Sequence, residues 1–395
     1  MIRRRLNKPP FYLSTITFDK FCLGGRSPLI LLHLHTFLTT MTNLSDRVNA
    51  MEESATLAMS RITRELKAQG KDIVALTLGE PDFTTPEFIK DAAIQAVKDN
   101  YSFYTPVSGY LDLRESICLK LQRDNGLAYT PDQIVVSTGA KQSIANVVMA
   151  MINPGDEVII PTPYWVSYAE IVKLAGGIPV FVETDISTDF KMTAEQFRSA
   201  ISPKSKMMMF SSPCNPSGSV YAQEELAEWV DIIADSGIFV ISDEIYEHIN
   251  FVGGHTSLAS FDRIKEQVIT VNGVSKAWAM TGWRLGYIAA SKEIAQACDK
   301  IQGQFTSATC SITQRAVIAA MQANPNVLNE MVATYKSRRD LVLSYLNKIT
   351  DIKTNVPQGA FYLFPDVSAY FGRKFEGQII ETAEDLTKYL LNEGL

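Results

Sequence analysis

The stretch "VNGVSKAWAMTGWRLGY", residues 271–287, holds two cations, Lys276 and Arg284, in a run that is otherwise free of charge. Apolar runs at 268–271 and 285–290 flank it and predict buried strands, because strands covered on both faces have near-continuous apolar sequence. Two cations between buried strands have two explanations. Either both side chains reach solvent, or they hold an anionic and electrophilic ligand between them.

Short apolar runs alternate with amphipathic stretches along most of the chain, and this pattern predicts an α/β fold. We expect strands at 134–136, 157–160, 180–182, 207–210, 238–241, 268–271 and 285–290, and helices that include 141–151, 222–236 and 293–302. Such alternation is typical of a mostly parallel sheet flanked by helices. Ligands of these folds bind beyond the carboxyl ends of the strands.

The two ends of the chain depart from this alternation. We expect 1–40 to be a leader, either a misassigned start or an organellar presequence, and 41–87 to be an N-terminal arm with part of a small domain. Residues 88–325 then form the large domain and 326–395 an incomplete small domain. A helical pattern runs almost to the last residue, so we also expect the natural chain to continue further.

Composition narrows the class of protein. The formal net charge of the 395 residues is −6, although residues 1–40 are basic, so the body of the protein is acidic and argues against nucleic acid or an anionic membrane as partner. The five cysteines form no CxxC pair, which favours reduced thiols and a cytoplasmic location. The four histidines have no metal-binding spacing, and we expect no metal.

Polar residues follow several of the expected strands. The turn "STGAKQ" at 137–142 would present the backbone N–H groups of Gly139, Ala140 and Lys141 to a phosphate, although small turns before helices are common. Asn215 lies between prolines in "SSPCNPSG", and helix capping is an alternative role for such a residue.

Two further strand ends carry an acid, a phenol and an indole. Asp243 and Tyr246 lie in "SDEIYEH", where Asp243 has helix capping as its alternative, and Trp165 ends "PTPYW", where a core aromatic is the alternative. Together with the phosphate turn, these groups suit a flat, phosphorylated, heteroaromatic aldehyde. The lysine bonds to the aldehyde, the acid protonates a ring nitrogen, the indole stacks, and the arginine binds the phosphate.

The motif at 272–287, "NGVSKAWAMTGWRLGY", resembles the pyridoxal-phosphate lysine motif of the class I/II aminotransferases. The stretches "LTLGEPDF", "PYWVSY", "SSPCNPSG" and "SDEIYE" resemble other motifs of that family, in the family's order. The subgroup that this chain resembles is that of bacterial aspartate and prephenate aminotransferases. The resemblance implies pyridoxal phosphate as cofactor and a fold type I transferase, with a large domain of mostly parallel sheet and a smaller α/β domain.

The resemblance also implies roles for individual residues. Lys276 is the catalytic residue that bonds to the cofactor and moves a proton, Asp243 pairs with the pyridinium nitrogen, and Tyr246 and Asn215 hold the ring oxygen. Trp165 stacks on the ring. The phosphate is held by Gly139, Ala140, Lys141, Ser275, Arg284 and, from the neighbouring subunit of a homodimer, Tyr104.

The resemblance further implies that the substrate is bound by Gly79, Trp165, Asn215, Thr56 and Lys141. Thr56 and Lys141 would bind a distal carboxylate, which implies aspartate or glutamate as donor, a 2-oxo acid as acceptor and prephenate as a possible acceptor. A solvated lysine at a helix start is the alternative for Lys141.

Other functions stay open on the sequence. A broad aromatic or kynurenine transaminase, or a β-lyase, would use the same cofactor. A pyridoxal-phosphate-binding protein without turnover is the alternative from another class, because no late arginine matches the one with which the family binds the substrate α-carboxylate. Arg373 is the only arginine after Ala360, and it does not match that motif.

Overall fold

A seven-stranded sheet lies at the centre of the computed structural model, which describes residues 44–52, 55–76 and 78–393. The strands, in chain order, are β1 (Ile134–Ser137), β2 (Glu157–Pro161), β3 (Ile178–Val182), β4 (Ser205–Ser211), β5 (Phe239–Asp243), β6 (Val268–Gly273) and β7 (Gly286–Ala289). Their order across the sheet is β1-β7-β6-β5-β4-β2-β3. Every predicted strand is present, with ends within two residues of the predicted ones.

The sheet is mostly parallel, as predicted. Strands β2 to β6 pair in parallel with their neighbours, whereas β7 runs antiparallel to both β1 and β6. The carboxyl ends of β4, β5 and β6 therefore meet at one edge, and the segment that follows β6 returns from this edge into β7.

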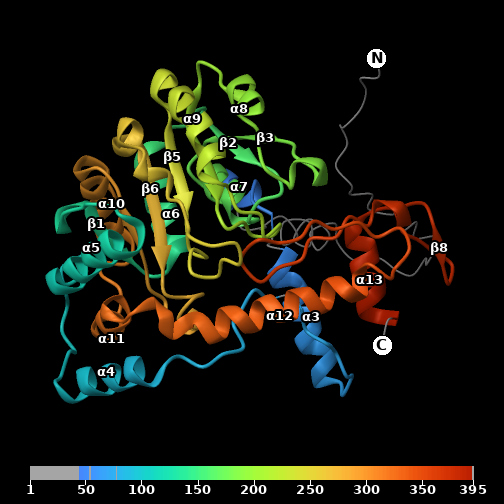
Figure 1. Ribbon diagram of the computed structural model, residues 1–395, viewed down its shortest axis with the longest axis horizontal. Helices are drawn as coiled ribbons and strands as arrows, with labels where there is room; N and C mark the ends of the chain where they lie inside the picture. Colours follow the sequence, from blue (N-terminus) through green and yellow to red (C-terminus); the bar gives the residue numbers. More distant parts are fainter. Residues whose placement is uncertain (1–43, 53–54, 77, 394–395) are drawn as a thin grey trace, which may run out of the picture. The chain divides into compact units, whose positions relative to one another are not determined.

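Helices cover both faces of the sheet (Figure 1). In chain order they are α2 (Asp46–Asn49), α3 (Ala55–Ala68), α4 (Glu87–Lys98), α5 (Leu111–Asn125), α6 (Ala140–Met151), α7 (Ser167–Leu174), α8 (Ala194–Ala200), α9 (Gln223–Ser236), α10 (Lys292–Phe305), α11 (Ser311–Gln322), α12 (Asn329–Leu346) and α13 (Ala383–Glu393). A small hairpin of β8 (Lys374–Phe375) and β9 (Gln378–Ile379) precedes α13.

Alternate residues of β4 enter two separate hydrophobic cores. Met208 and Phe210 pack in the core that includes buried residues of α5, α9 and α11, whereas Met207 and Met209 pack in the core that includes α6, α7 and α10. Successive side chains of a strand point to opposite faces, so a strand buried on both sides must be apolar throughout. The run "MMMF" at 207–210 meets this requirement.

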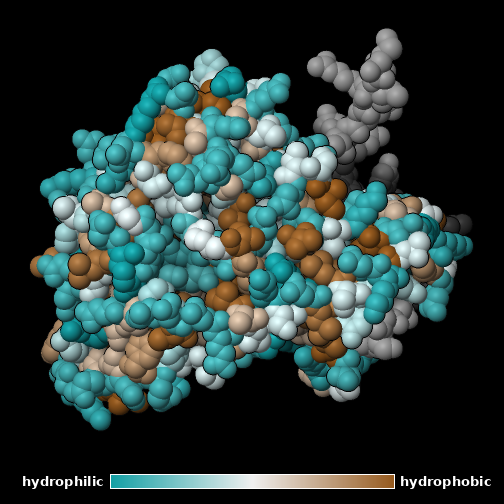
Figure 2. Space-filling view, viewed as in Figure 1, coloured by the Kyte–Doolittle hydropathy of each residue, from teal (hydrophilic) through white to brown (hydrophobic). Residues whose placement is uncertain are grey.

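The longest helix of the region after residue 325 is α12, which extends from the neighbourhood of α11 towards α13 (Figure 1). No helix in the described part of the chain is long and apolar enough to cross a membrane. Figure 2 shows a mostly hydrophilic face, with hydrophobic residues in separate patches. The division at 88 and 326 into a large and a small domain stays a prediction, and the leader at 1–40 lies outside the described residues.

Candidate active site

The predicted site residues gather at the carboxyl edge of the sheet. A cavity of about 510 Å³ lies there. Eleven of the predicted residues line it, namely Thr56, Gly79, Ala140, Lys141, Trp165, Asn215, Asp243, Tyr246, Ser275, Lys276 and Arg284. They come from segments that are up to 228 residues apart in the chain, between Thr56 and Arg284, so only the folded chain brings them together.

Lys276 follows β6 and projects into this cavity. Its Nζ donates a hydrogen bond of 2.6 Å to the carbonyl oxygen of Gly79, and it lies 5.7 Å from the centre of the Tyr246 ring. Burial of the ammonium group lowers the pKa of Lys276 from 10.5 to about 8, with Arg284 acting in the same direction and Glu80 and Asp243 opposing it. A neutral amine, which is the nucleophilic form, is therefore available near neutral pH.

Asp243 is the last residue of β5 and is buried beneath the cavity. Its Oδ2 accepts a 2.7 Å hydrogen bond from the hydroxyl group of Tyr168, and its Oδ1 accepts one of 3.3 Å from the Ile245 amide. Burial raises the pKa of Asp243 to about 6, although these hydrogen bonds lower it. Above that pH the pocket holds a buried carboxylate, which favours a protonated ring nitrogen as its partner.

Tyr246 and Asn215 converge on a third residue, Tyr362. The hydroxyl oxygens of Tyr246 and Tyr362 are 2.5 Å apart, and Asn215 Nδ2 donates to Tyr362 Oη at 3.4 Å. Burial raises the pKa of Tyr362 to about 12, so its hydroxyl group stays protonated at neutral pH. Three hydrogen-bonding groups thus meet at one point, which suits a ring hydroxyl oxygen.

The sequence analysis did not identify Tyr168 or Tyr362. Tyr168 lies in the quoted motif "PYWVSY", but its contact with Asp243 crosses 75 residues of chain. Tyr362 lies in "GAFYLF", after the helix α12, and meets Tyr246 across 116 residues. A Cβ atom at Gly79 would lie 2.0 Å from Tyr362 Oη, so this approach requires glycine.

The predicted phosphate turn connects β1 to α6. Gly139 is the N-cap of α6 with φ 88° and ψ 158°, a conformation that L side chains avoid. A Cβ atom there would lie 2.3 Å from Arg284 Nη2, so the guanidinium group lies directly over the turn. The first amides of α6 have no acceptor within the helix, and together with Arg284 they offer hydrogen-bond donors suited to an anion.

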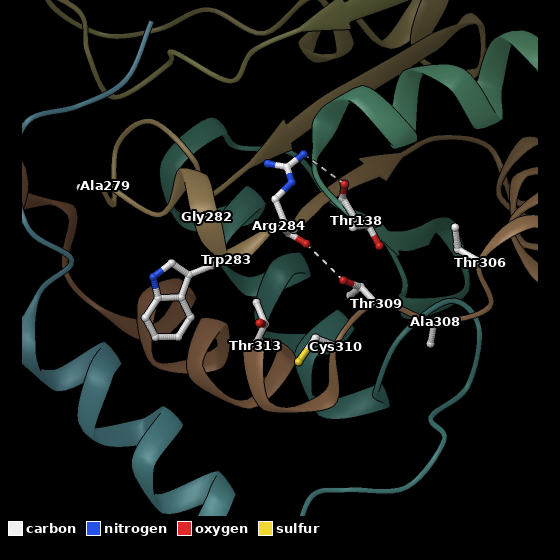
Figure 3. Close-up of a pocket in the computed structure, with 10 residues that line it drawn as sticks. All are labelled: Thr138, Ala279, Gly282, Trp283, Arg284, Thr306, Ala308, Thr309, Cys310 and Thr313. Atoms are coloured by element: carbon white, nitrogen blue, oxygen red, sulfur yellow. Dashed lines mark hydrogen bonds between the residues drawn. The ribbon is translucent and has the colours of Figure 1, made fainter. Parts of the chain in front are cut away.

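Arg284 is held in place from two sides (Figure 3). Its Nη1 donates to the Thr281 carbonyl at 2.9 Å and its Nη2 to the Thr138 carbonyl at 3.3 Å. The Thr309 hydroxyl donates to the Arg284 carbonyl at 3.1 Å. Arg284 also lines a second cavity, whose volume is about 670 Å³. Figure 3 shows the residues that line it, among them several threonines and Cys310. Lys276 and Asp243 line only the smaller cavity, which we take as the active site.

Lys141 and Trp165 form the outer wall. Lys141 Nζ lies 4.9 Å from the centre of the Trp165 ring, and partial burial together with Arg284 lowers its pKa. Thr56, from α3, lines the same cavity. Lys141 thus faces the cavity rather than bulk solvent alone. Arg373 pairs instead with Asp351 at 2.7 Å and does not line the cavity.

Tyr104 does not line the active-site cavity of its own chain. Its side chain is 99% exposed and borders a third cavity of about 480 Å³, together with Phe103 and Thr309. Thr309 also borders the cavity next to Arg284. The cavity beside Tyr104 and the cavity next to Arg284 therefore share Thr309 in their linings.

These groups fit pyridoxal phosphate on chemical grounds. Arg284 and the start of α6 suit the phosphate, Asp243 suits the ring nitrogen, Tyr246 and Asn215 suit the ring oxygen, and Lys276 offers an amine with a lowered pKa. Cβ atoms at Gly139 and Gly79 would collide with Arg284 and Tyr362, two residues that line this cavity. The fold and this site define a pyridoxal-phosphate-dependent enzyme.

Comparison with known proteins narrows the class. The model of the family "Aminotransferase class I and II" matches residues 71–395, and the chain belongs to this family. The chain is 46% identical to an aspartate aminotransferase of Pinus pinaster over 89% of this chain and 73% of the relative. It is 45% identical to a bifunctional aspartate aminotransferase and glutamate/aspartate-prephenate aminotransferase of Petunia hybrida, over 89% and 75%.

A solved structure agrees with the fold. The aspartate aminotransferase from Rhizobium meliloti has a TM-score of 0.86 and 38% sequence identity, with 89% of each chain covered. The predicted aminotransferase class, the α/β fold and the pyridoxal phosphate cofactor are thereby confirmed. The roles of individual site residues stay predictions.

Proposed function

We propose that this aminotransferase takes the amino group from aspartate or glutamate and passes it to a 2-oxo acid in two half-reactions. The observation that carries this proposal is Lys141, whose ammonium group lies 4.9 Å from the centre of the Trp165 ring, in the lining of the cavity that also holds Lys276. A cation there offers a partner to the distal carboxylate of a dicarboxylic amino acid. The relatives named as aspartate aminotransferases support the same substrates.

The residues divide the chemical work between them. The cofactor, when bound, supplies an electron-poor ring that stabilises negative charge on the adjacent carbon of the substrate. Asp243 keeps the ring nitrogen protonated, and Tyr246 and Asn215 orient the ring oxygen. Lys276 has a pKa of about 8, so it can accept a proton from the substrate carbon and return it elsewhere.

Prephenate is a further proposed acceptor. It carries a carboxylate distant from its 2-oxo acid group, so Lys141 could hold it as it holds the distal carboxylate of aspartate. The Petunia hybrida relative is named for prephenate as well as for aspartate and glutamate, which supports this extension.

Exchange of Lys141 tests the substrate class. We expect Lys141→Gln to lower kcat/KM for aspartate by roughly tenfold to a hundredfold, because a charged hydrogen bond contributes about 1.5–3 kcal/mol. The value for a neutral amino acid such as alanine should change little, and Lys141→Arg should recover part of the aspartate activity. Equal losses for aspartate and alanine would contradict the assignment of Lys141 to the distal carboxylate.

We also propose a homodimer with shared active sites and a cytoplasmic location. Phe103 and Tyr104 are 75% and 99% exposed, beside the cavity next to Arg284, and a second copy of the chain would cover them. The four cysteines in the described part of the chain are free thiols, which supports a reducing compartment.

A further inference from the structure

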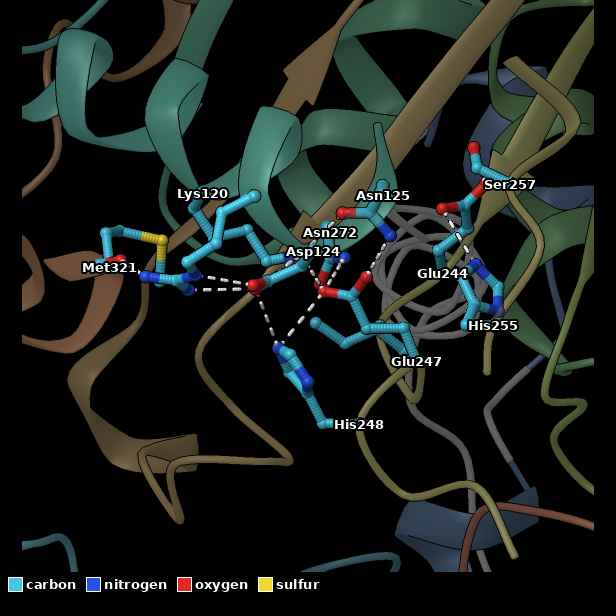
Figure 4. A network of polar contacts seen from close by, with 12 residues as sticks. Lys120, Asp124, Asn125, Glu244, Glu247, His248, His255, Ser257, Asn272 and Met321 are labelled. Carbon is cyan, nitrogen blue, oxygen red and sulfur yellow. Dashed lines mark hydrogen bonds and ion pairs between the residues drawn. The ribbon is translucent and has the colours of Figure 1, made fainter. Parts of the chain in front are cut away.

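The end of β5 and the turn that follows it present side chains to two different environments. Asp243 and Tyr246 line the active-site cavity, whereas Glu244 and Glu247 enter a buried polar cluster behind it (Figure 4). Backbone bonds close the turn, from the Glu247 amide to the Glu244 carbonyl at 2.9 Å and from the Ile249 amide to the Tyr246 carbonyl at 2.8 Å. Fixing the two glutamates therefore fixes the two residues that face the cofactor.

One half of this cluster holds Glu247 with a permanent cation. The Lys120 ammonium group, from α5, donates to Glu247 Oε1, and Asn272 Nδ2 donates to the same oxygen at 2.8 Å. Asn125 Nδ2 donates to Oε2 at 2.7 Å. Burial alone would raise the pKa of Glu247, but the Lys120 ammonium group beside it holds this pKa well below its usual range. Glu247 is a carboxylate at every physiological pH.

The other half holds Glu244 with a titratable partner. His255 Nε2 lies 2.9 Å from Glu244 Oε2, and these side chains are only 6% and 1% exposed. Glu244 Oε1 accepts hydrogen bonds from Ser242 at 2.9 Å and from Ser257 at 2.7 Å. Burial alone would lower the pKa of His255, but Glu244 and then Glu247 raise it above its ordinary value of 6.5.

The charges of the cluster balance only when His255 is protonated. Besides His255, the cluster holds three carboxylates, Glu244, Glu247 and Asp124, and two permanent cations, Lys120 and Arg123. A second histidine, His248, lies next to Glu247 (Figure 4). Burial lowers the pKa of His248, so this histidine is neutral. With His255 as a cation, three positive groups face three carboxylates. Loss of its proton leaves Glu244 as a buried carboxylate without a cationic partner, which is unfavourable.

His255 also belongs to a loop that reaches the other side of the cavity. The loop is exposed at Val252, which is 58% accessible, whereas the His255 side chain is buried. Its first part pairs with the segment before Tyr362, through the Phe251 amide and the Gln358 carbonyl at 2.8 Å and the Ala360 amide and the Ile249 carbonyl at 2.8 Å. The His255–Glu244 pair thus supports Asp243, Tyr246 and Tyr362 together.

A metal ion does not explain this cluster. Glu244, Glu247 and His255 offer ligand atoms within 4.8 Å of one another. Both oxygens of Glu247 are already hydrogen-bonded, and the Lys120 ammonium group occupies the position of a cation beside it. We assign no metal here.

We propose that His255 is a positioning residue for the cofactor site. As an imidazolium ion paired with Glu244, it holds the turn that carries Asp243 and Tyr246, so that pyridoxal phosphate binds more tightly when His255 is protonated. By linkage, cofactor binding must then favour the protonated form of His255 in return. The cofactor affinity falls as the pH rises through the pKa of His255.

Histidine titration by NMR tests the proposal on the unaltered protein. The chain has four histidines, so carbon-13 labelling of histidine gives few signals, and His255→Gln and His248→Gln assign two of them. We expect the His255 signal to titrate above 6.5 in the apoprotein, and higher still with pyridoxal phosphate bound. A rise of one pKa unit on binding corresponds to a tenfold gain in affinity. An equal or lower pKa in the loaded protein would overturn the proposal.

Cofactor affinity against pH supplies a second measurement. We expect the ratio of the dissociation constants of His255→Gln and wild type to be roughly tenfold near pH 6 and to approach one near pH 9. Lys276 and the cofactor phosphate titrate in both proteins, so their effects on affinity cancel in this ratio. A purely structural role of His255 would lower affinity equally at every pH, and that result would also overturn the proposal.

Two further variants give matched controls. His248→Gln alters a neutral histidine of the same cluster, and its affinity ratio should stay near one at every pH. The double variant Glu244→Gln/His255→Gln removes both charges, so it should bind the cofactor more tightly than His255→Gln alone. A double variant no better than His255→Gln would contradict the argument from charge balance.

Discussion

At the scale of single residues, the reactivity of the site depends on how burial shifts two pKa values in opposite directions. Lys276 titrates near 8 and Asp243 near 6, so between these values Asp243 is ionised and part of Lys276 is neutral. The same low dielectric that disfavours the ammonium group disfavours the carboxylate. The site therefore holds a buried anion above about pH 6, and its fraction of neutral, nucleophilic amine grows as the pH approaches 8 and exceeds it.

The pKa of Lys276 predicts the pH dependence of covalent cofactor capture. Only the neutral amine reacts, so the capture rate should rise about tenfold per pH unit below pH 8 and level off above it. The growth of the visible absorption band after mixing apoprotein with pyridoxal phosphate measures this rate. Lys276→Arg, which keeps the charge, should show no covalent capture at any pH. A wild-type rate that still climbed tenfold between pH 9 and 10 would show an unshifted lysine.

Asp243→Asn should stabilise the apoprotein while it weakens cofactor binding. The folded pKa of Asp243 lies above the unfolded value of 3.8, so ionisation costs stability at a pH above 6, and this cost vanishes below about 4. At pH 8 the variant should therefore unfold at a higher temperature than wild type. Its unfolding free energy should exceed that of wild type by at most about 2–3 kcal/mol. At pH 4 the two melting temperatures should converge. If the variant melted above wild type by the same margin at pH 4 and at pH 8, the ionisation of Asp243 would not be the cause.

At the scale of elements, the start of α6 decides whether the phosphate can bind. We expect Gly139→Ala to raise the dissociation constant of pyridoxal phosphate at least roughly tenfold, since the new methyl group meets Arg284 and the backbone conformation is strained by about 1–3 kcal/mol. Equilibrium binding followed by absorbance measures this change. Gly282→Ala is the matched control, because its methyl group enters open space beside Arg284. Equal losses in both variants would argue against a specific phosphate turn.

The elements themselves were largely predictable from sequence, because two-sided burial demands apolar strands. The antiparallel course of β7 was not predictable, since its apolar run reads the same in either direction. Contacts between segments that are distant in the chain could not be predicted from the sequence either. The motif "SDEIYE" contained Asp243 and Tyr246, but the opposite face of the same turn, with Glu244 and Glu247, became meaningful only once His255 and Lys120 were placed against it.

At the scale of the whole molecule, Tyr104 makes the proposed homodimer testable. If Tyr104 belongs to the active site of the other chain, each site takes its Lys276 from one chain and its Tyr104 from the other. Tyr104→Ala and Lys276→Ala then remove groups that different chains contribute to one site. Each variant alone should be inactive or nearly so. After the two are mixed and refolded together, mixed dimers should carry one intact site, and activity should return to about a quarter of wild type. No recovery, with mixed dimers present by mass spectrometry, would place Tyr104 in its own chain's site or outside both.

The three consecutive methionines of β4 offer a spectroscopic consequence of the layered fold. Met207 and Met209 lie in one hydrophobic core and Met208 in the other, and all three are fully buried. Their methyl groups are adjacent in sequence yet report from opposite sides of the sheet. Carbon-13 methyl labelling would therefore follow the loosening of each helical layer separately during unfolding, with a single strand as the source of both signals.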